Sequence, residues 1–420
     1  MKKATLILFT FICTTLSTQT IIIADVNVIP ISTNTVLQHQ DVHLKNGVID
    51  KIVSHKPTSG SLKNTVVING EGKYIMPGLA DMHVHLPDGS EPLTKEKAYA
   101  YYLQNGVTVL RSMRGELFHP QHRDSINKGL IIAPKLYISY SLPEKDSALT
   151  KKELDAFIQF IKTNRFDFAK YIEGISEVKM KEVSKALKDN GIMVAGHAYK
   201  DLKTSIEFGF KSIEHISPLA NAYLLDSTGF DKLLNDMKTN NISYCPTESF
   251  SKIVGFQFSI DENMKRNGMN MIDTTLANGW KRDYLNYLNM INKKSTTYYG
   301  KQVKSAKAEF EMFNALLRRM IKANVNVLLS PDNCIFNVPG YAMVEEMKLY
   351  KEAGISSYDI LKISTLNAAN FFNESKKWGT ISRGKEANLV LLDKNPLEDI
   401  ENIKSVRATI VKGKILYEKK

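Results

Sequence analysis

The chain has 420 residues, of which 43% are hydrophobic and 24% are charged, and it contains no repeat or low-complexity tract of useful length. This composition is typical of a folded globular protein and excludes a disordered or fibrous chain. The formal net charge is +12, but the basic residues are spread along the whole chain and form no stripe. We therefore expect a small-molecule substrate, no nucleic acid and no stable membrane insertion. The oligomeric state stays open, a homo-oligomer included.

Residues 1–18 have the pattern of a secretory signal peptide. Two lysines precede the apolar stretch 4–16, which is too short to span a bilayer, and small polar residues follow it. We expect cleavage near Thr18–Gln19 and export to the periplasm or the extracellular space. The mature chain would carry 54 basic and 44 acidic residues and only two cysteines, Cys245 and Cys334. A disulfide framework is therefore not expected, and the core must stabilise the fold.

Two β-rich segments lie at the ends of the mature chain, over residues 19–76 and 377–420. Both consist of short runs of β-branched and apolar residues that are separated by turn signals such as Asn-Gly and Lys-Gly. The expected strands include Thr20–Ala24, Thr65–Ile68, Ala387–Asp393, Ala408–Lys412 and Lys414–Tyr417. The stretch between the two segments has a different pattern.

Residues 77–376 alternate short apolar strands with amphipathic helices. The expected strands are Met82–Leu86, Thr108–Leu110, Lys135–Ser139, Phe166–Tyr171, Met193–His197, Ser212–His215, Ile242–Pro246 and Val325–Ser330. The expected helices include Lys151–Asn164, Glu177–Asn190 and Lys200–Phe208. Alternating units predict a parallel sheet, and eight of them predict a closed (β/α)8 TIM barrel. The long interval after the seventh strand predicts an insertion over about residues 248–305, either a lid over the barrel mouth or a surface decoration.

Four histidines are candidate metal ligands because they end predicted strands of this barrel. His83 and His85 lie at the end of the first strand, where the period of two points both imidazoles to the same side. His197 and His215 end the fifth and sixth strands. Each histidine alone is more often structural, but four of the nine histidines at strand ends indicate a metal site. Active sites of such barrels are assembled at these strand ends.

Lys170 and Asp332 complete the candidate site. A protonated Lys170, at the end of the fourth strand, would be repelled by a cation and could simply face solvent. Burial lowers the pKa of a lysine, however, and the neutral amine can take up carbon dioxide to give a carbamate that bridges two cations. Asp332 follows the eighth strand, where a carboxylate can bind metal and transfer the proton of an attacking water. An ordinary turn aspartate is the alternative.

These residues resemble those of the amidohydrolase superfamily, and the resemblance covers nearly all of the mature chain. Four segments carry it: Pro77–His85, Gly106–Thr108, Gly196–Ala198 with Ile213–His215, and Gly379–Leu397. In that family the β-rich ends form a small β-sandwich beside the barrel. The resemblance also implies two divalent metal ions, zinc by the nature of their ligands. The implied ligands are His83, His85 and Asp332 for the more buried ion, His197 and His215 for the second, and carboxylated Lys170 as the bridge.

Within the superfamily the chain looks closest to prolidase-like dipeptidases and imidazolonepropionase-like proteins. Lys170 argues against imidazolonepropionases and deaminases, which generally lack the bridging lysine. The deaminases tend to have a glutamate where this chain has Lys200. Departures from the family pattern are Ser330-Pro331 before the aspartate, Ser112 after the second strand and Asn388 in the tail. They bear on the substrate more than on the chemistry.

The expected reaction is hydrolysis of an amide bond in a dipeptide or an N-acyl amino acid. The two cations would convert a bridging water to hydroxide, and Asp332 would act as general acid and base. Candidate substrate contacts near strand ends are Tyr199, Arg114, Tyr171 and Glu248, which are equally compatible with packing at the barrel rim. A lactonase or esterase, a deaminase, and a non-catalytic secreted binding protein on the same fold stay as alternatives.

Overall fold

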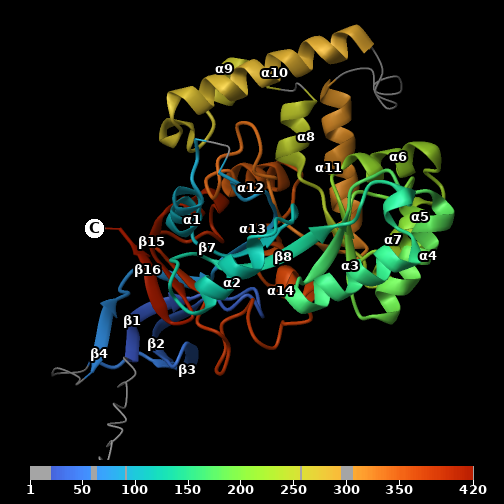
Figure 1. Ribbon diagram of the computed structural model, residues 1–420. Coiled ribbons are helices and arrows are strands. Elements are labelled where there is room, and N and C mark those ends of the chain that lie inside the picture. The colour runs from blue at the N-terminus through green and yellow to red at the C-terminus, as the bar shows by residue number, and fades with distance from the viewer. Residues whose placement is uncertain (1–19, 58–63, 90–91, 256–257, 295–305, 420) are drawn as a thin grey trace, which may run out of the picture.

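The computed structural model describes residues 20–57, 64–89, 92–255, 258–294 and 306–419. The predicted signal peptide lies outside the described residues, as does part of the predicted insertion. Across the described ranges, no helix combines the length and the hydropathy needed to cross a bilayer. Two sheets and a surrounding layer of helices make up the architecture (Figure 1).

A curled sheet of eight parallel strands occupies the centre of the molecule (Figure 1). In chain order its strands are β6 (Leu79–Val84), β7 (Val107–Ser112), β8 (Lys135–Ser141), β9 (Phe168–Tyr171), β10 (Met193–Gly196), β11 (Ser212–Glu214), β12 (Ser243–Cys245) and β13 (Asn326–Val327). Each strand pairs in parallel with the next one. Parallel neighbours require a crossover, usually a helix, so the alternating sequence pattern explains this sheet. A backbone hydrogen bond of 3.1 Å from Met82 N to Leu329 O links the first strand to the residues after the last.

The strands lie where the alternating pattern places them. Every residue of β6, β7 and β9 is buried, as expected for parallel strands that are covered on both faces. Two strands differ most from the prediction. The first was expected over Met82–Leu86 and runs over Leu79–Val84, so His85 lies beyond it. The eighth was expected over Val325–Ser330 and is regular only over Asn326–Val327. A side chain supplements the strand partners there: Leu328 N donates to the Tyr244 carbonyl at 2.8 Å, and the Asn367 amide donates to the Val327 carbonyl at 2.9 Å.

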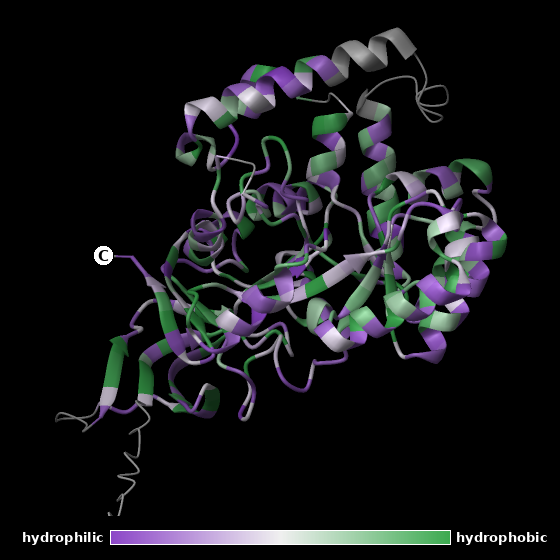
Figure 2. Ribbon diagram, in the orientation of Figure 1, coloured by the Kyte–Doolittle hydropathy of each residue, from purple (hydrophilic) through white to green (hydrophobic). Residues whose placement is uncertain are grey.

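Helices cover the outer face of the parallel sheet and alternate apolar with polar residues along their length (Figure 2). They are α1 (Lys95–Gln104), α2 (His119–Asn127), α3 (Lys151–Asn164), α4 (Glu177–Asp189), α5 (Leu202–Glu207), α6 (Ser217–Leu225), α7 (Phe230–Thr239), α11 (Ala306–Lys322), α12 (Met343–Glu352), α13 (Ser357–Ile363) and α14 (Leu366–Phe371).

Helix α3 shows how the local sequence determines where an outer helix begins, where it ends and which face it buries. Its buried residues are spaced as one face of an α-helix and belong to the main core. They are Leu154, Phe157, Ile158 and Ile161. Thr150 and Glu153 form a capping box at its start, and Arg165 ends it in the left-handed conformation with φ of 56°. The expected helix Lys151–Asn164 is therefore confirmed residue for residue.

The two ends of the chain meet in a second sheet with a core of its own. Its strands are β1 (Thr20–Val28), β2 (Leu37–Lys45), β3 (Val48–Ser54), β4 (Thr65–Asn69), β5 (Tyr74–Pro77), β14 (Leu389–Leu392), β15 (Val406–Val411) and β16 (Lys414–Glu418). Their order is β16-β15-β14-β5-β1-β2-β3, with β4 paired to β1. The antiparallel pair of β5 and β14 joins the two ends, with Pro77 opposite Leu389. Strand β5 leads directly into β6, the first strand of the parallel sheet.

The predicted insertion is helical in its described part. It contains α8 (Glu248–Val254), α9 (Ile260–Met264) and α10 (Thr274–Lys294), and α10 is the long helix at the top of Figure 1. Apolar side chains of these helices, including Tyr284, pack with Phe336 and Val338, which follow β13. The hydroxyl of Tyr101 also donates a hydrogen bond of 2.8 Å to the carbonyl of Met271. The insertion is therefore packed against the loop that carries Asp332.

Candidate metal centre

Asp332 lies among three of the predicted histidine ligands at the carboxyl ends of the parallel strands. Its Oδ1 is 3.4 Å from Nε2 of His85, and its Oδ2 is 3.9 Å from Nε2 of His83 and 4.0 Å from Nδ1 of His215. The last two distances are too long for hydrogen bonds. One ligand atom each from His83, His215 and Asp332 lies within 4.8 Å of the other two. The arrangement suits a divalent cation between these groups.

The fourth histidine extends this cluster. The ring centroids of His197 and His215 are 5.2 Å apart, and those of His83 and His215 are 5.0 Å apart. Gly196 brings His197 close to the neighbouring strand, because a Cβ at Gly196 would lie 2.1 Å from the carbonyl oxygen of Tyr171. The structure thus brings together the residues that sequence spacing alone had placed at strand ends.

Lys170 of β9 is buried, with 3% of its surface exposed. Burial lowers the pKa of its amine, and the carboxylates of Glu214 and Asp332 oppose that effect. The alternative interpretation of Lys170, in which its side chain faces solvent, is therefore wrong. A neutral amine is the form that can react with carbon dioxide.

Three of the four predicted histidine ligands have a hydrogen-bond partner at Nδ1. His83 Nδ1 lies 3.0 Å from Glu214 Oε2, His197 Nδ1 lies 3.1 Å from the carbonyl of Ile172, and His215 Nδ1 lies 2.8 Å from the Thr247 hydroxyl. A carboxylate or a carbonyl can only accept, so Nδ1 of His83 and of His197 donates. Their Nε2 atoms then carry the lone pairs that a metal requires.

The loop that presents Asp332 is fixed by side-chain hydrogen bonds. Asp332 has a φ of 56°, in the left-handed region that a non-glycine residue adopts only when its surroundings hold it there. The Ser330 hydroxyl donates to Oδ1 of Asp81 at 2.5 Å and accepts from Asp332 N at 3.1 Å. The Asn333 side chain makes two hydrogen bonds to the backbone of His85. Ser330, a departure from the family pattern, therefore ties the aspartate to the first strand.

The charge states of the cluster fit a metal centre. Burial holds the pKa values of His83 and His215 well below the ordinary value, so both imidazoles are neutral. Burial raises the pKa of Asp332 to about 7. Its Oδ1 is buried and accepts no hydrogen bond within the described part of the chain. Neutral imidazoles around a carboxylate oxygen without a donor form the nitrogen and oxygen ligand set that zinc prefers.

One of the four candidate substrate contacts borders a cavity beside the metal ligands. This cavity has a volume of about 260 Å³ and is lined by His85, Arg114 and Asn333 and by Trp280 of α10. The Arg114 side chain is 67% exposed, with Nε 3.5 Å from Glu116 Oε1. Its guanidinium is thus available to a ligand in the cavity.

The other three candidates are buried. The rings of Tyr171 and Tyr199 are 5.5 Å apart in the main core, and the Tyr199 hydroxyl donates to the carbonyl of Ile175 at 3.1 Å. Glu248 is fully buried at the start of α8, where the Glu346 carboxylate accepts a hydrogen bond of 2.9 Å from its backbone N–H. Both tyrosines and Glu248 lie outside the lining of the 260 Å³ cavity.

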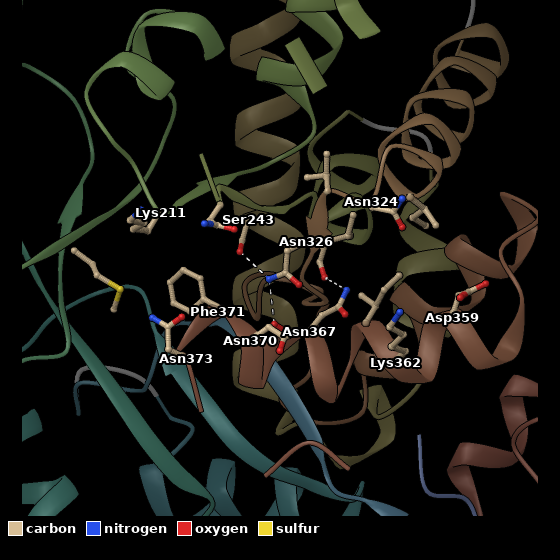
Figure 3. A pocket seen from close by; sticks show the side chains of 16 residues that line it. Lys211, Ser243, Asn324, Asn326, Asp359, Lys362, Asn367, Asn370, Phe371 and Asn373 are labelled. Carbon is tan, nitrogen blue, oxygen red and sulfur yellow. Dashed lines mark hydrogen bonds between the residues drawn. The ribbon is translucent and has the colours of Figure 1, made fainter. Parts of the chain in front are cut away.

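A larger cavity of about 710 Å³ lies at the opposite end of the strands (Figure 3). Many of its lining residues are asparagines, and three of them, Asn241, Asn324 and Asn373, adopt positive φ values between 53° and 57° in turns. Asparagine tolerates that conformation, so these turns account for the composition. Asn326 is bonded to the Ser243 hydroxyl and to the Asn367 carbonyl (Figure 3). None of the predicted ligands lines this cavity.

Sequence reasoning missed the residues that hold the ligands. Arg111 and Glu214 are charged residues inside wholly buried strands, and that unusual position was the available signal. Thr247 and Asn333 gave no comparable signal, because a hydroxyl or an amide in a loop is ordinary. Lys200, where deaminases tend to have a glutamate, is exposed and pairs with Glu177.

Known proteins resemble the chain over most of its length. The sequence profile of the amidohydrolase family matches residues 74–416. A dihydroorotase of Clostridium botulinum (strain Eklund 17B / Type B) is 23% identical over 416 residues, which cover 90% of this chain and 95% of that protein. The structure of a Xaa-Pro dipeptidase with bound methionine matches with a TM-score of 0.70 and 18% identity, over 96% of this chain and 100% of that chain.

An ochratoxinase of A. niger matches with a TM-score of 0.67 and 18% identity, over 96% of each chain. At such identities the structural matches show a shared fold, whereas the family profile covers most of the sequence. The chain therefore belongs to the amidohydrolase family, with prolidase-like proteins among its structural neighbours, and it is a hydrolase that acts on carbon–nitrogen bonds.

Proposed function

We propose that this chain is an exported metallohydrolase that cleaves the amide bond of dipeptides or N-acyl amino acids. The observation that carries the proposal is the position of Asp332, within 4.0 Å of ring nitrogens of His83, His85 and His215. In this proposal His83, His85 and Asp332 would hold one divalent cation, His197 and His215 would hold a second, and carboxylated Lys170 would be a ligand shared by both. Zinc fits the imidazole and carboxylate ligands.

When bound, the two cations would lower the pKa of a water molecule and polarise the substrate carbonyl. Asp332 would accept one proton of the water molecule while the oxygen of that water attacks the carbonyl carbon of the substrate. Asp332 then passes the proton to the leaving nitrogen as the carbon–nitrogen bond breaks, so that an acid and an amine are released. A carboxylate beside the attacking water is suited to both transfers, because Oδ1 of Asp332 has no hydrogen-bond donor within the described part of the chain.

The cavity beside His85 supports a small substrate. A volume of about 260 Å³ suits a ligand the size of a dipeptide better than a folded protein. Arg114 would pair with the free carboxylate of such a substrate, and Trp280 would cover its apolar part. The names of two structural neighbours, a Xaa-Pro dipeptidase and an ochratoxinase, agree with substrates of this kind.

The same proposal includes a domain organisation. Residues 1–18 are a signal peptide, residues 19–76 and 377–420 form a small β-sandwich, and residues 77–376 form a closed (β/α)8 barrel with an insertion at about 248–305. The hydrogen bond between Met82 and Leu329 supports barrel closure, because it connects the first strand to the residues that follow the last strand. The separate core of the terminal sheet supports the second unit.

Metal analysis of the purified protein, combined with hydrolysis of a dipeptide library, tests the proposal on the wild type and on Lys170→Ala. We expect two ions per wild-type chain and hydrolysis of one class of dipeptide or N-acyl amino acid. Lys170→Ala should lose metal and activity together. A wild type that binds only trace metal would contradict the proposal. Activity on lactones or aryl esters alone would contradict the amide substrate, and release of ammonia would indicate a deaminase.

A further inference from the structure

A pair of opposite charges lies wholly inside the parallel sheet next to the candidate metal centre. Arg111 of β7 and Glu214 of β11 both have side chains that are 0% exposed. The guanidinium Nη2 lies 2.9 Å from Oε1 and 2.8 Å from Oε2 of the carboxylate. A buried ion pair often stabilises a protein no more than apolar residues of similar size would. Stability alone therefore does not account for this pair.

Both carboxylate oxygens of Glu214 have two hydrogen-bond partners. Oε1 accepts from Arg111 and, at 2.5 Å, from the Ser212 hydroxyl. Oε2 accepts from Arg111 and is 3.0 Å from Nδ1 of His83. Arg111 Nε also donates to the carbonyl of Met82, which directly precedes His83. The network thus contacts His83 at its ring, through Glu214, and fixes the carbonyl of the preceding residue, through Arg111.

We infer that Glu214, held in place by Arg111, is a positioning residue that prepares His83 to bind a divalent cation. This inference rests on the metal centre of the proposed function. A carboxylate has no proton to give, so Nδ1 of His83 must be the donor and Nε2 must carry the lone pair. That Nε2 faces Asp332 Oδ2 at 3.9 Å. The carboxylate also makes the imidazole a more basic ligand.

Aromatic rings shield this network from water. The guanidinium carbon of Arg111 is 4.8 Å from the ring centroid of Phe371 and 5.8 Å from that of Phe168. Phe371 also lines the 710 Å³ cavity (Figure 3), so the same residue borders the cavity and contacts the guanidinium. Without water, the interaction between the two charges is strong and their geometry is fixed.

The Nδ1 partners make the two predicted metal sites unequal. The second ion would be bound by His197 and His215, whose Nδ1 atoms contact a carbonyl at 3.1 Å and a hydroxyl at 2.8 Å. These partners are neutral, whereas Glu214 is an anion within hydrogen-bond distance of His83. The ion at His83 should therefore depend on Glu214, and the ion at His197 should depend on it much less.

The first test is the metal affinity of Glu214→Gln, which keeps the shape of the side chain and removes its charge. The apoprotein would be titrated with Zn²⁺ or Co²⁺ in competition with a chromophoric chelator. We expect one of the two ions to bind about 10- to 100-fold more weakly and the Co²⁺ absorption spectrum to change. The matched control is Glu374→Gln, another carboxylate with several donors, including Lys135 Nζ and Trp378 Nε1 at 2.9 Å. The control should bind both ions as the wild type does.

A double variant separates positioning from stability. Arg111→Met combined with Glu214→Gln leaves no unpaired buried charge, so the midpoint of thermal unfolding should recover relative to Glu214→Gln alone. Metal affinity should stay low. Recovery of both stability and affinity would mean that the pair is only structural, and it would overturn the inference.

The tautomer of His83 in the wild type is a measurement that does not depend on the folding of any Glu214 variant. Long-range ¹H–¹⁵N correlation spectra of the histidine-labelled apoprotein should show protonated Nδ1 and unprotonated Nε2, with His83→Gln used for assignment. A proton on Nε2 would overturn the inference. If the wild type binds two ions and Glu214→Gln matches it, only this inference fails. If the wild type binds none, the proposed function fails.

Discussion

Asn333 and His85 are joined by two reciprocal hydrogen bonds, one of 2.7 Å from His85 N to Asn333 Oδ1 and one of 2.8 Å from Asn333 Nδ2 to the His85 carbonyl. His85 lies just beyond β6, where no strand neighbour fixes its backbone. The amide of Asn333 supplies that support from the loop that also carries Asp332. The segment after β6 and the loop after β13 are therefore fixed to each other, and with them the predicted ligands His85 and Asp332.

Replacing Asn333 by Ala should loosen this connection. The free energy of unfolding should fall by about 1 to 3 kcal/mol, because two backbone groups lose their partner. The value of kcat/KM should fall by about tenfold or more, because small displacements of ligands are costly in such centres. Thermal unfolding and steady-state kinetics measure the two effects. Asn190→Ala, which removes a similar bond to the Ala186 carbonyl at 2.9 Å, should cost stability without loss of activity.

Lys170 should need carbon dioxide to support metal binding. Burial lowers the pKa of its amine, so the neutral form that reacts with carbon dioxide is more populated than in an exposed lysine. Apoprotein reconstituted with Zn²⁺ in buffer purged of carbon dioxide should regain little activity, and added bicarbonate should restore it. Lys170→Ala should not respond to bicarbonate. Full activity of the wild type without bicarbonate would exclude the carbamate.

Arg114→Ala should weaken substrate binding. A charge-assisted hydrogen bond contributes about 1.5 to 3 kcal/mol, so KM for a substrate with a free carboxylate should rise by at least about tenfold. The value of kcat should change little, because Arg114 is not among the predicted metal ligands. The control is Arg165→Ala. The guanidinium of Arg165 is exposed and pairs with Asp124 at 2.6 Å, so its removal should leave KM unchanged. An equal KM in Arg114→Ala would exclude the contact.

Glu248→Gln should stabilise the protein at high pH. Burial raises the pKa of Glu248 from 4.5 to about 7, against the influence of Lys252, so the folded state binds its proton more tightly than the unfolded state does. The wild type should therefore lose stability as the pH rises from about 4.5 to 7, by no more than about 3 kcal/mol. Glutamine does not titrate, so the difference in unfolding midpoint between variant and wild type should grow over this range. Activity should stay near that of the wild type, because the carboxylate lies away from the 260 Å³ cavity.

The order of strands and helices could be predicted because it depends on local pattern. Short runs such as Val107–Leu110 and the amphipathic face of α3 carry their own signal. Since the carboxyl ends of parallel strands meet at one edge, His197 and His215 could be placed near each other without knowledge of their contacts.

The supports of the centre could not be predicted in the same way. The contact of His83 with Glu214 joins residues 131 positions apart, and the contact of His85 with Asn333 joins residues 248 positions apart. Such pairs depend on strand register and loop conformation, which have no local pattern. The position of Glu248 has a related cause, because its backbone N–H donates a hydrogen bond to Glu346 of α12, which lies 98 positions further along the chain.

The pairing of β5 with β14 has a consequence for the synthesis of this protein. Strand β5 leads directly into the strand that carries His83, and its edge is covered by residues Leu389–Leu392 near the end of the chain. A nascent chain that emerges from its amino end therefore exposes this edge until residues Leu389–Leu392 have been made, long after β5. Contacts between such distant segments form slowly, and an open edge invites pairing with other chains. Truncation of the last strands should therefore produce aggregation during expression before any defect in catalysis is measurable.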